Sequence, residues 1–450
     1  MTEAGNNYSE KKTQLHISVR NLVEFIFREG DIDNRSSRTM SADAMMEGTR
    51  IHRKIQGSMG KEYQAEVPLS LVVEGDLYEL TVEGRADGIF TEDGKCFVDE
   101  IKGMYRRVEL FEKPVFVHRA QAMCYAYIFA LQNNMETIGI QMTYCNLETE
   151  QTKYFREEFS FEEIKKWFDD LMEEYGKWAT FQCEIKNQRQ TSIKELDFPF
   201  EYRPGQKKLV SDVYRTIMRQ KLLFMQAPTG VGKTISTIFP AVKAVGEELA
   251  DRIFYLTAKT ITATVAKETF ELLEKNGYRA KTIQITAKEK LCPCDEMECN
   301  PVTCPYAKGH FDRVNDAVFD LLHRCEMIER DDILSQADRY TVCPFELCLD
   351  TASWCDNVIC DYNYVFDPNV YLKRFFQEGI KGDYIFLIDE AHNMVERSRQ
   401  MYSAQIYKED FLTVKRIMKE HSRSIEKALE KCNKILLGMK RCLLYTSDAA

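Results

Sequence analysis

The sequence predicts an α/β protein in which a domain with a mixed β-sheet precedes a domain with a parallel β-sheet. Residues 62–101 alternate apolar and polar side chains, as half-buried strands do, and they lie between helical patterns. From about residue 200 onward, short apolar strands alternate with helices, which is typical of a parallel sheet. A glycine-rich loop, residues 227–234, lies between an apolar run and a helix. The 450 residues fit two or three domains.

The first half is predicted to form one mixed sheet within a domain over residues 1–181. Within residues 62–101, the polar turn 92–95 separates two strands. The other predicted elements are helices at 40–58, 116–132 and 161–181 and strands at 138–146 and 152–159. The polar residues 182–198 are interpreted as a linker.

The second half is predicted to form a parallel sheet with helices on both faces. Its expected strands are 221–226, 252–257, 281–286, 357–361 and 384–389, and its expected helices include 205–220 and 261–276. Residues 287–350 interrupt this alternation. After residue 395 the sequence is helical to residue 441.

The composition and net charge exclude several classes of protein. The apolar fraction is 44%, the charged fraction 29%, and the net charge of −10 argues against nonspecific coating of nucleic acid, although a local basic groove is compatible with it. The chain has neither an apolar run of membrane-spanning length nor an apolar N-terminal signal, so we expect a cytoplasmic protein without membrane contact. Nine of the 15 cysteines fall between Cys292 and Cys360, which favours a metal site over a disulfide framework.

The glycine-rich loop is predicted to bind the phosphates of ATP. Its glycines and the following helix N-terminus direct backbone N–H groups at phosphate oxygens. We expect Lys233 to reach the β- and γ-phosphates and Thr234 to ligate Mg²⁺. The loop consists of Ala227, Pro228, Thr229, Gly230, Val231, Gly232, Lys233 and Thr234.

Two acidic residues follow the apolar strand 384–388, at the carboxyl end where a parallel sheet places its chemistry. We expect Asp389 to hold Mg²⁺ and Glu390 to orient or deprotonate the attacking water.

Four cysteines stand out as metal ligands by their sequence context: Cys292, Cys299, Cys304 and Cys343. Thiolates are soft ligands that suit iron–sulfur clusters or zinc. Cys294 is an alternative to Cys292, and the type of ligand alone does not exclude zinc.

A second candidate site lies in the first half. Glu100 and Lys102 share one face of a strand, and the preceding hairpin strand can bring Asp87 beside them. With His52 on the first helix, the two carboxylates suit Mg²⁺ or Mn²⁺, which would polarise a phosphodiester. Lys102 would stabilise the water or the developing charge, and Gln121 and Tyr125 share one helix face.

The second half resembles the superfamily-two helicases. The loop and the Asp-Glu-Ala-His run at 389–392 resemble their ATP site, and residues 202–206 resemble their adenine-reading element, with Gln206 as the reader. Residues 256–260 resemble a motif that touches the nucleic-acid backbone in such enzymes.

The cysteines upstream of this run, with CPFELC and VICDYNYVFDP, resemble the XPD/DinG family of iron–sulfur helicases. The resemblance implies a RecA-like motor domain over 199–286 and 351–395, and a [4Fe–4S] cluster on Cys292, Cys299, Cys304 and Cys343 within 287–350. It also implies the start of a helical arch at 396–441 and movement 5′ to 3′ on single-stranded DNA. Candidate base-stacking residues are Tyr306, Phe311, Tyr362 and Tyr364.

The first half resembles the RecB-type branch of the PD-(D/E)XK nucleases, because G-x-x-x-H, D, E-x-K and Q-x-x-x-Y follow one another on helix, strand, strand and helix. The resemblance implies a restriction-endonuclease-like α/β fold. It makes His52, Asp87 and Glu100 metal ligands, Glu100 and Lys102 catalytic, and Gln121 and Tyr125 DNA-binding. The cysteines of this half are dispersed, so we expect no cluster there.

Together, the motifs and the two family resemblances imply an ATP-dependent 5′–3′ iron–sulfur DNA helicase fused to a metal-dependent nuclease, acting in DNA repair on single-stranded or flapped DNA. The alternatives are an ATP-dependent remodeller whose nuclease fold only grips DNA, and an ATPase with a zinc-stabilised module. No second motor lobe is recognisable, and residues 442–450 resemble translated adapter sequence. We therefore expect an N-terminal part of a longer protein, with negligible DNA-stimulated ATPase activity of its own.

Overall fold

The computed structural model describes residues 12–35, 42–228, 230–258, 260–377, 380 and 382–447. The chain divides into two compact units. The first comprises Met1–Asp361 and Lys373–Asp389, and the second comprises Tyr362–Leu372 and Glu390–Ala450. Among the described residues, no helix combines the length and the apolar character that crossing a membrane requires.

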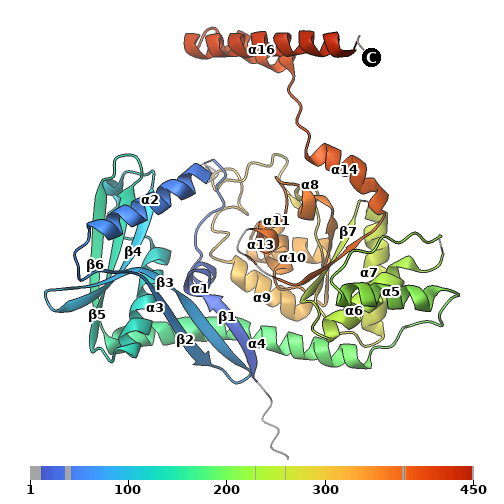
Figure 1. Cartoon of the computed structure of the whole chain (residues 1–450), viewed down its shortest axis with the longest axis horizontal. Coiled ribbons are helices and arrows are strands. Elements are labelled where there is room, and N and C mark those ends of the chain that lie inside the picture. The colour runs from blue at the N-terminus through green and yellow to red at the C-terminus, as the bar shows by residue number, and fades with distance from the viewer. Residues whose placement is uncertain are drawn as a thin grey trace, which may run out of the picture. The chain divides into compact units, whose positions relative to one another are not determined.

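The first unit begins with a six-stranded mixed sheet (Figure 1). Its path is β1-β3-β4-β5-β6, with β2 paired to β3; β1–β3 and β4–β5 are parallel and the other pairs antiparallel. The prediction of one mixed sheet is confirmed. The strands are β1 (Thr13–Ser18), β2 (Gln64–Glu74), β3 (Tyr78–Glu92), β4 (Lys95–Met104), β5 (Thr137–Asn146) and β6 (Thr152–Ser160).

The predicted turn between β3 and β4 is also confirmed. Asp93 and Gly94 have φ angles of 51° and 77°, the left-handed conformation that a two-residue hairpin turn needs. This tight turn fixes the register in which Gly88 lies opposite Asp99.

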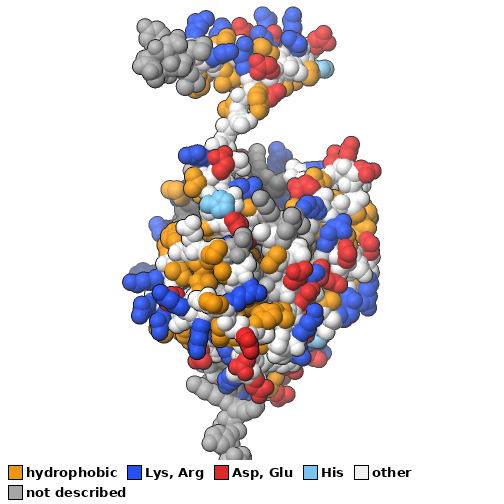
Figure 2. Space-filling model, turned by 90° about the vertical axis from the view of Figure 1, so that its right-hand side faces the viewer, with side chains coloured by type: hydrophobic (Ala, Val, Ile, Leu, Met, Phe, Trp, Pro, Cys, Tyr) orange, Lys and Arg blue, Asp and Glu red, His pale blue; other side chains and the backbone are white. Residues whose placement is uncertain are grey.

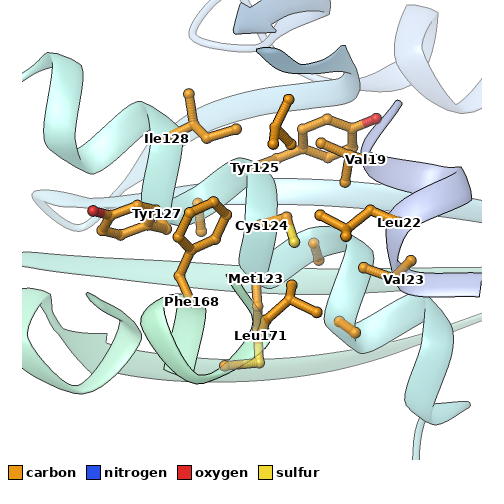
Figure 3. Close-up of a cluster of buried hydrophobic side chains, with 14 of the residues drawn as sticks. Val19, Leu22, Val23, Met123, Cys124, Tyr125, Tyr127, Ile128, Phe168 and Leu171 are labelled. Atoms are coloured by element: carbon orange, nitrogen blue, oxygen red, sulfur yellow. The ribbon is translucent and has the colours of Figure 1, made fainter. Parts of the chain in front are cut away.

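Three helices bury the main core of this domain. They are α1 (Val19–Ile26), α3 (Phe116–Gln132) and α4 (Phe161–Glu195), and their apolar side chains point toward one another (Figure 3). Helix α3 matches its predicted bounds. Strand β1 and helix α1 were not predicted; α1 begins where the Ser18 hydroxyl accepts a hydrogen bond from the Asn21 amide at 3.1 Å.

Helix α2 (Ala42–Ser58) packs on a separate, smaller core. Among the described side chains of this helix, Ile51 and Ile55 lie in that core, against Ile101, Cys145 and Leu147. A short 3₁₀ turn, Val108–Leu110, follows β4.

Helix α4 continues well beyond its predicted end at Phe181. Residues 182–195, expected within a polar linker, are helical because one face of them is buried. Cys183 belongs to the core of the first sheet, whereas Ile193 belongs to the core of the second. Arg189 lies between them and forms an ion pair with Asp356.

The second sheet has five strands in the order β11-β7-β10-β8-β9, and every pair is parallel, as predicted. Its core includes side chains of α6 (Lys233–Gly246) and α7 (Thr260–Lys275), and α5 (Gln206–Met218) packs nearby. The strands are β7 (Arg252–Thr257), β8 (Thr282–Gln284), β9 (Met327–Ile328), β10 (Asn357–Asp361) and β11 (Tyr384–Ile388).

The strand predicted at 221–226 is wrong. These residues are not assigned to a strand, and Leu222 and Phe224 are 89% and 88% exposed. Strand β11 is an edge of the described sheet and has no further partner there, yet residues 221–226 do not pair with it, so an apolar run beside an open edge is not sufficient for a strand. Figure 2 looks onto the side where α5, α6 and α7 lie in Figure 1, and it shows hydrophobic side chains exposed among charged ones.

The cysteine-rich insert, residues 287–350, is mostly helical. Its elements are α8 (Lys288–Leu291), α9 (Val314–Arg324), β9, α10 (Arg330–Tyr340) and the start of α11 (Pro344–Ala352). Strand β9 joins the insert to the parallel sheet through β8. A short helix, α13 (Lys373–Phe376), precedes β11.

The second unit is helical, as predicted for 396–441. It contains α12 (Asn363–Phe366), a 3₁₀ turn at Ala391–Asn393, α14 (Met394–Met401), α15 (Lys408–Met418) and α16 (Arg423–Ser447). Helix α16 continues past residue 441 into the expected tail, and residues 448–450 lie outside the described part of the chain.

Candidate functional site

The hairpin β3–β4 places the two predicted carboxylates side by side. Asp87 precedes Gly88, which lies opposite Asp99, so Asp87 and Glu100 occupy facing positions. One Asp87 oxygen, Oδ2, accepts a hydrogen bond from the Ile101 amide at 2.7 Å. The strand pairing therefore fixes the orientation of Asp87.

Helix α2 brings the predicted histidine to the same place. His52 Nδ1 lies 3.6 Å from Asp87 Oδ1. Gln56, one turn further along the helix, donates to the backbone oxygen of Asp87 at 2.9 Å. Both contacts hold α2 against β3.

The predicted lysine and the two residues of α3 complete the group. Lys102 Nζ lies 2.6 Å from Glu100 Oε1 and donates to Gln121 Oε1 at 3.3 Å. Tyr125, 3% exposed, fits because residue 84 is glycine, where a Cβ would lie 2.4 Å from the tyrosine hydroxyl. All six side chains that the sequence singled out in this half thus gather around the β3–β4 hairpin.

Burial and neighbouring charges shift the pKa values of the side chains at this site. Burial, followed by the nearby charge of Asp87, raises the pKa of Glu100 to about 8. Burial alone would lower the pKa of His52, but its hydrogen bond to Asp87 and the charge of that residue outweigh burial, so the pKa is raised. Two carboxyl groups sharing a buried site favour a bound cation.

The type of donor atom at this site, and not the present arrangement of the side chains, suits a hard divalent cation. Glu100 is 1% exposed, and its Oε2 is buried without a hydrogen-bond partner, beside the oxygens of Asp87. Carboxylate oxygens with one imidazole suit Mg²⁺ or Mn²⁺. Among the described residues, no group of three or more His, Cys, Asp or Glu side chains is arranged to hold a metal ion.

A buried polar network supports the strand that carries Glu100. The neighbouring Asp99 is completely buried and accepts hydrogen bonds from Thr143 at 2.6 Å and from Tyr63 at 3.1 Å. Gln141 donates to Thr143 at 3.1 Å. These partners, which sequence reasoning missed, lie on β5 and on the chain entering β2, so no local motif reveals them.

The glycine-rich loop ends at the start of α6. Gly230 and Gly232 have φ angles of 86° and 76°, which favour glycine. Lys233 Nζ donates to the Ala227 carbonyl at 3.2 Å. Pro228 lies in the same loop, Thr234 is in the first turn of α6, and Thr229 lies outside the described residues.

Gln206 contacts this loop directly. Its side-chain amide donates to the Val231 carbonyl at 3.1 Å, and its oxygen accepts from the Arg203 amide at 3.0 Å. Arg203 also donates to the Gly230 carbonyl, a contact that the sequence did not predict. The element at 202–206 therefore lies beside the phosphate loop.

The acidic pair follows β11. Ile385 of β11 shares a core with Ile235 and Ile238 of the loop helix, and the Asp389 amide donates to the Leu256 carbonyl at 3.0 Å. Glu390 is the first residue of the second unit after β11, and its φ is 49°. His392 Nδ1 lies 3.3 Å from Glu390 Oε2.

The candidate cysteines of the insert fall into two sets. The Cys294 and Cys304 sulfurs are 3.8 Å apart, and Cys292 also interacts with Cys294. Burial, followed by the contact with Cys304, raises the pKa of Cys294 to about 12, and the charge of Cys299 acts on Cys343. Thiolates suit an iron–sulfur or zinc centre by type, but within the described residues the two sets are not arranged as one metal site.

Cys343 has a buried histidine beside it. His310 is 0% exposed, and its Nδ1 accepts a hydrogen bond from the Cys343 amide at 3.1 Å. Burial raises the pKa of Cys343 to about 11 and lowers that of His310 to about 4. His310 is separated from Cys343 by 32 residues of sequence, so spacing gave no indication of this contact.

The candidate stacking residues divide into two groups. Tyr362 and Tyr364 are 0% and 7% exposed, so they are core residues, which corrects their candidacy. Tyr306 and Phe311 are partly exposed, and the Tyr306 hydroxyl donates to Asp338 at 2.8 Å.

Comparison with known proteins identifies relatives of the second half. The sequence model of the family described as DEAD_2 matches residues 270–411. The chain is 20% identical over 253 residues to the regulator of telomere elongation helicase 1 homolog of Caenorhabditis elegans, covering 47% of this chain and 25% of that protein. It is 23% identical over 239 residues to the general transcription and DNA repair factor IIH helicase subunit XPD/RAD3 of Saccharomyces cerevisiae, covering 45% and 30%.

A solved structure titled XPD_Helicase aligns over 52% of this chain and 40% of its own, with a TM-score of 0.35 and 17% identity. The chain thus spans about a quarter to a third of the length of the curated relatives it matches. The chain is thus similar, over part of its length, to the family described as DEAD_2 and to these helicases.

Proposed function

We propose that this chain is part of an ATP-dependent 5′–3′ DNA helicase of the iron–sulfur type that is fused to a metal-dependent DNA nuclease. It would act in DNA repair or processing on single-stranded or flapped DNA. The observation that carries the nuclease is the meeting of His52, Asp87, Glu100 and Lys102, from one helix and two strands, around an unpartnered buried oxygen of Glu100.

In the nuclease, His52, Asp87 and Glu100 would hold Mg²⁺ or Mn²⁺. The bound ion would polarise the scissile phosphodiester and lower the pKa of a water molecule. The Ile101 amide holds Asp87 in place, and Gln121 holds the Lys102 ammonium.

Lys102 is the residue that best distinguishes catalysis from binding. Its ammonium lies against Glu100, where it can stabilise the attacking water or the developing negative charge. Gln121 and Tyr125 lie beside Lys102 on α3, but they are 8% and 3% exposed, so they would support Lys102 and not reach the DNA as the sequence resemblance implies.

In the motor, the loop 227–234 would bind the phosphates of ATP. Backbone N–H groups at the start of α6 and the Lys233 ammonium would neutralise the phosphate charge, while Thr234 and Asp389 would hold Mg²⁺. Gln206 is in position to link nucleotide recognition to the loop, because it bonds to the Val231 carbonyl. Glu390 would orient the attacking water.

In the insert, Cys299, Cys304 and Cys343 together with Cys292 or Cys294 would hold a [4Fe–4S] cluster. When bound, the cluster would tie the 287–350 segment together. Visible absorbance and equimolar iron and sulfide after anaerobic purification would support it; zinc alone by metal analysis would contradict it.

The first experiment is degradation of end-labelled single-stranded DNA with Mn²⁺ or Mg²⁺, comparing the wild type with Lys102→Ala. A matched control is Lys95→Ala on the same strand, because Lys95 is half exposed and pairs only with the surface residue Glu158 at 2.7 Å. We expect metal-dependent cutting by the wild type and the control, and its loss in Lys102→Ala with DNA binding retained.

The product ladder would also give the polarity of cutting. A folded wild type that binds DNA without cutting it would instead favour the remodeller whose nuclease fold only grips DNA. Cutting that persists in Lys102→Ala would contradict the assignment of this site.

A further inference from the structure

The segment that leaves α1 runs along the cysteine-rich insert before the chain reaches α2 (Figure 1). We call residues 28–34 the strap. The Ile32 amide donates to the Ala307 carbonyl at 2.9 Å, and the Asn34 amide donates to the Cys299 carbonyl at 2.9 Å. Two backbone hydrogen bonds thus join the strap to the stretch that carries the predicted cluster cysteines.

Carboxylates on both sides add to this contact. Asp31 accepts the Gly309 amide at 2.6 Å, and Asp312 accepts the Gly30 amide at 2.7 Å. The Phe311 amide donates to the Gly30 carbonyl at 3.0 Å. Hydrogen bonds from amides to carboxylates are stronger than those between neutral groups.

Arg28 fixes the near end of the strap. Its guanidinium donates to Asn315 at 2.8 Å and forms an ion pair with Asp350 at 2.8 Å. Asn315 in turn donates to the Phe25 carbonyl at 2.8 Å, at the end of α1. Only 19% and 9% of the two charged side chains are exposed, so this pair is shielded from solvent.

The far end of the strap precedes the helix that carries His52. Six residues, 36–41, separate Arg35 from Ala42 at the start of α2. Of the described side chains of that helix, Ile51 and Ile55 lie in its small core. Gln56 and the ion pair of Arg50 with Glu150 also hold the helix, and the chain that enters it adds one further constraint.

We propose that the strap makes the nuclease site depend on the cysteine-rich insert. Ordering of residues 299–312 by their cysteines would hold the strap, and the strap would hold α2 with His52 beside Asp87. This inference rests on the proposed function, in which His52 and Asp87 bind the catalytic metal and the cysteines bind a cluster. Asp31 and Asp312 then act as positioning residues, because neither belongs to the metal site itself.

Chain entropy gives the size of the expected effect. With the strap docked, six residues lead into α2; with the strap released, all fifteen residues between α1 and α2, 27–41, become the loop. Loop closure scales with length to the power of about 3/2, so closing the longer loop is about fourfold less favourable. Exchange through opening of α2 should rise by about that factor.

The test is hydrogen exchange of the full chain, followed by mass spectrometry of peptides from the strap and from α2. The variants are Asp31→Ala, Asp312→Ala and Cys304→Ser. The matched control is Asp33→Ala, whose carboxylate accepts only from Arg35 within the same stretch, at 2.7 Å and 2.9 Å in its side-chain contacts. Asp31→Asn keeps an acceptor for the Gly309 amide and serves as the conservative variant.

We expect the three variants to raise exchange in both the strap and α2 by about fourfold, with β5 and β6 unchanged. Asp33→Ala should match the wild type, and Asp31→Asn, which keeps the acceptor without its charge, should lie between the wild type and Asp31→Ala. Mn²⁺-dependent cutting of single-stranded DNA should fall by a similar factor in the three variants.

Two outcomes would overturn the inference while leaving the nuclease intact. One is faster exchange in the strap with unchanged exchange in α2; the other is unchanged exchange in both segments after Cys304→Ser. A wild type that does not cut DNA would refute the proposed nuclease instead, and the exchange measurements would still decide whether the insert holds α2.

Discussion

The buried ion pair between Arg189 and Asp356 offers a quantitative test of how α4 supports the parallel sheet. Arg189→Ala would remove a guanidinium that pairs with Asp356 and donates to the Asp251 carbonyl at 3.2 Å. The side chains of the pair are 9% and 10% exposed, so Asp356 would be left as a buried charge with only the Lys281 amide, at 2.8 Å, as partner.

Removing one partner of a buried ion pair lowers the free energy of unfolding by about 3–5 kcal/mol. Because the Lys281 amide still bonds to Asp356, we expect a loss of about 3 kcal/mol here. Because 1.36 kcal/mol is tenfold, native-state hydrogen exchange of β10 amides should accelerate roughly 150-fold. Strands β3 and β4 of the other sheet should exchange as in the wild type. The control is Lys186→Ala, less than one turn earlier on α4, whose pair with Glu248 at 3.5 Å is exposed and worth about 0–1 kcal/mol.

A double variant, Arg189→Met with Asp356→Asn, removes both charges but keeps an acceptor for the Lys281 amide. It should recover much of the lost protection, because the buried charge is gone. If Arg189→Ala accelerates exchange no more than the Lys186→Ala control, or if the double variant is no better protected than the single one, this reasoning is refuted.

Three further outcomes are expected. Gly84→Ala puts a Cβ 2.4 Å from the Tyr125 hydroxyl, so the ring must move. Overpacking of this kind costs about 1–3 kcal/mol, and if that cost falls on the arrangement of the site, cutting of labelled single-stranded DNA should fall by about five- to 150-fold. Gln206→Ala removes the hydrogen bond to the Val231 carbonyl, so binding of a fluorescent ATP analogue should weaken by about two- to tenfold. Burial, with the charges of Lys102 and Arg20, lowers the pKa of His118 to about 4. In the unfolded chain the pKa of this imidazole is about 6.5. Between about pH 6.5 and pH 4 the unfolded chain therefore takes up a proton that the folded protein does not. Stability is therefore full above about pH 6.5 and falls by up to ~1.4 kcal/mol per unit between there and pH 4, and urea unfolding of His118→Gln should show a flatter dependence.

Each of these has a contrary result. Unimpaired cutting by Gly84→Ala would mean that Tyr125 does not need its present position, and Gly57→Ala, with open space around its Cβ, controls for the substitution. The control for Gln206→Ala is Lys207→Ala, because Lys207 is exposed. If both variants bind the nucleotide as tightly as the wild type, residues 202–206 take no part in nucleotide binding. Identical pH profiles for the wild type and His118→Gln would assign the acid sensitivity to other groups.

The local sequence pattern was sufficient to predict a helix or strand where the segment buries one face against its immediate neighbours. Helix α3 and strands β7 and β10 have the predicted bounds, because their apolar periodicity matches their burial. The residues of the candidate nuclease site could be predicted as a set, since strand and helix periodicity places Glu100 with Lys102 and Gln121 with Tyr125.

What could not be predicted depends on contacts between distant parts of the sequence. The run at 221–226 is apolar enough for a strand, yet it does not pair with the open edge of β11, and sequence pattern alone does not encode which strands pair. Most of residues 182–195 are polar, which is typical of a linker. In the structure they are part of helix α4, because Arg189 and Ile193 are buried against the second sheet. The strap contacts were invisible because its partners lie more than 250 residues away along the chain.

Helix α4 contributes side chains to the cores of both sheets without interruption. In such a helix every inserted residue adds about 1.5 Å of length and about 100° of rotation. One extra residue between Cys183 and Arg189 would therefore turn the buried face of the second half of α4 toward solvent, whereas seven would return it to within about 20° of its original phase. The two ends of α4 therefore keep their buried faces in register only when the inserted length is close to a whole number of helical turns. In a series of insertions through this stretch, the free energy of unfolding should rise and fall with the helical period.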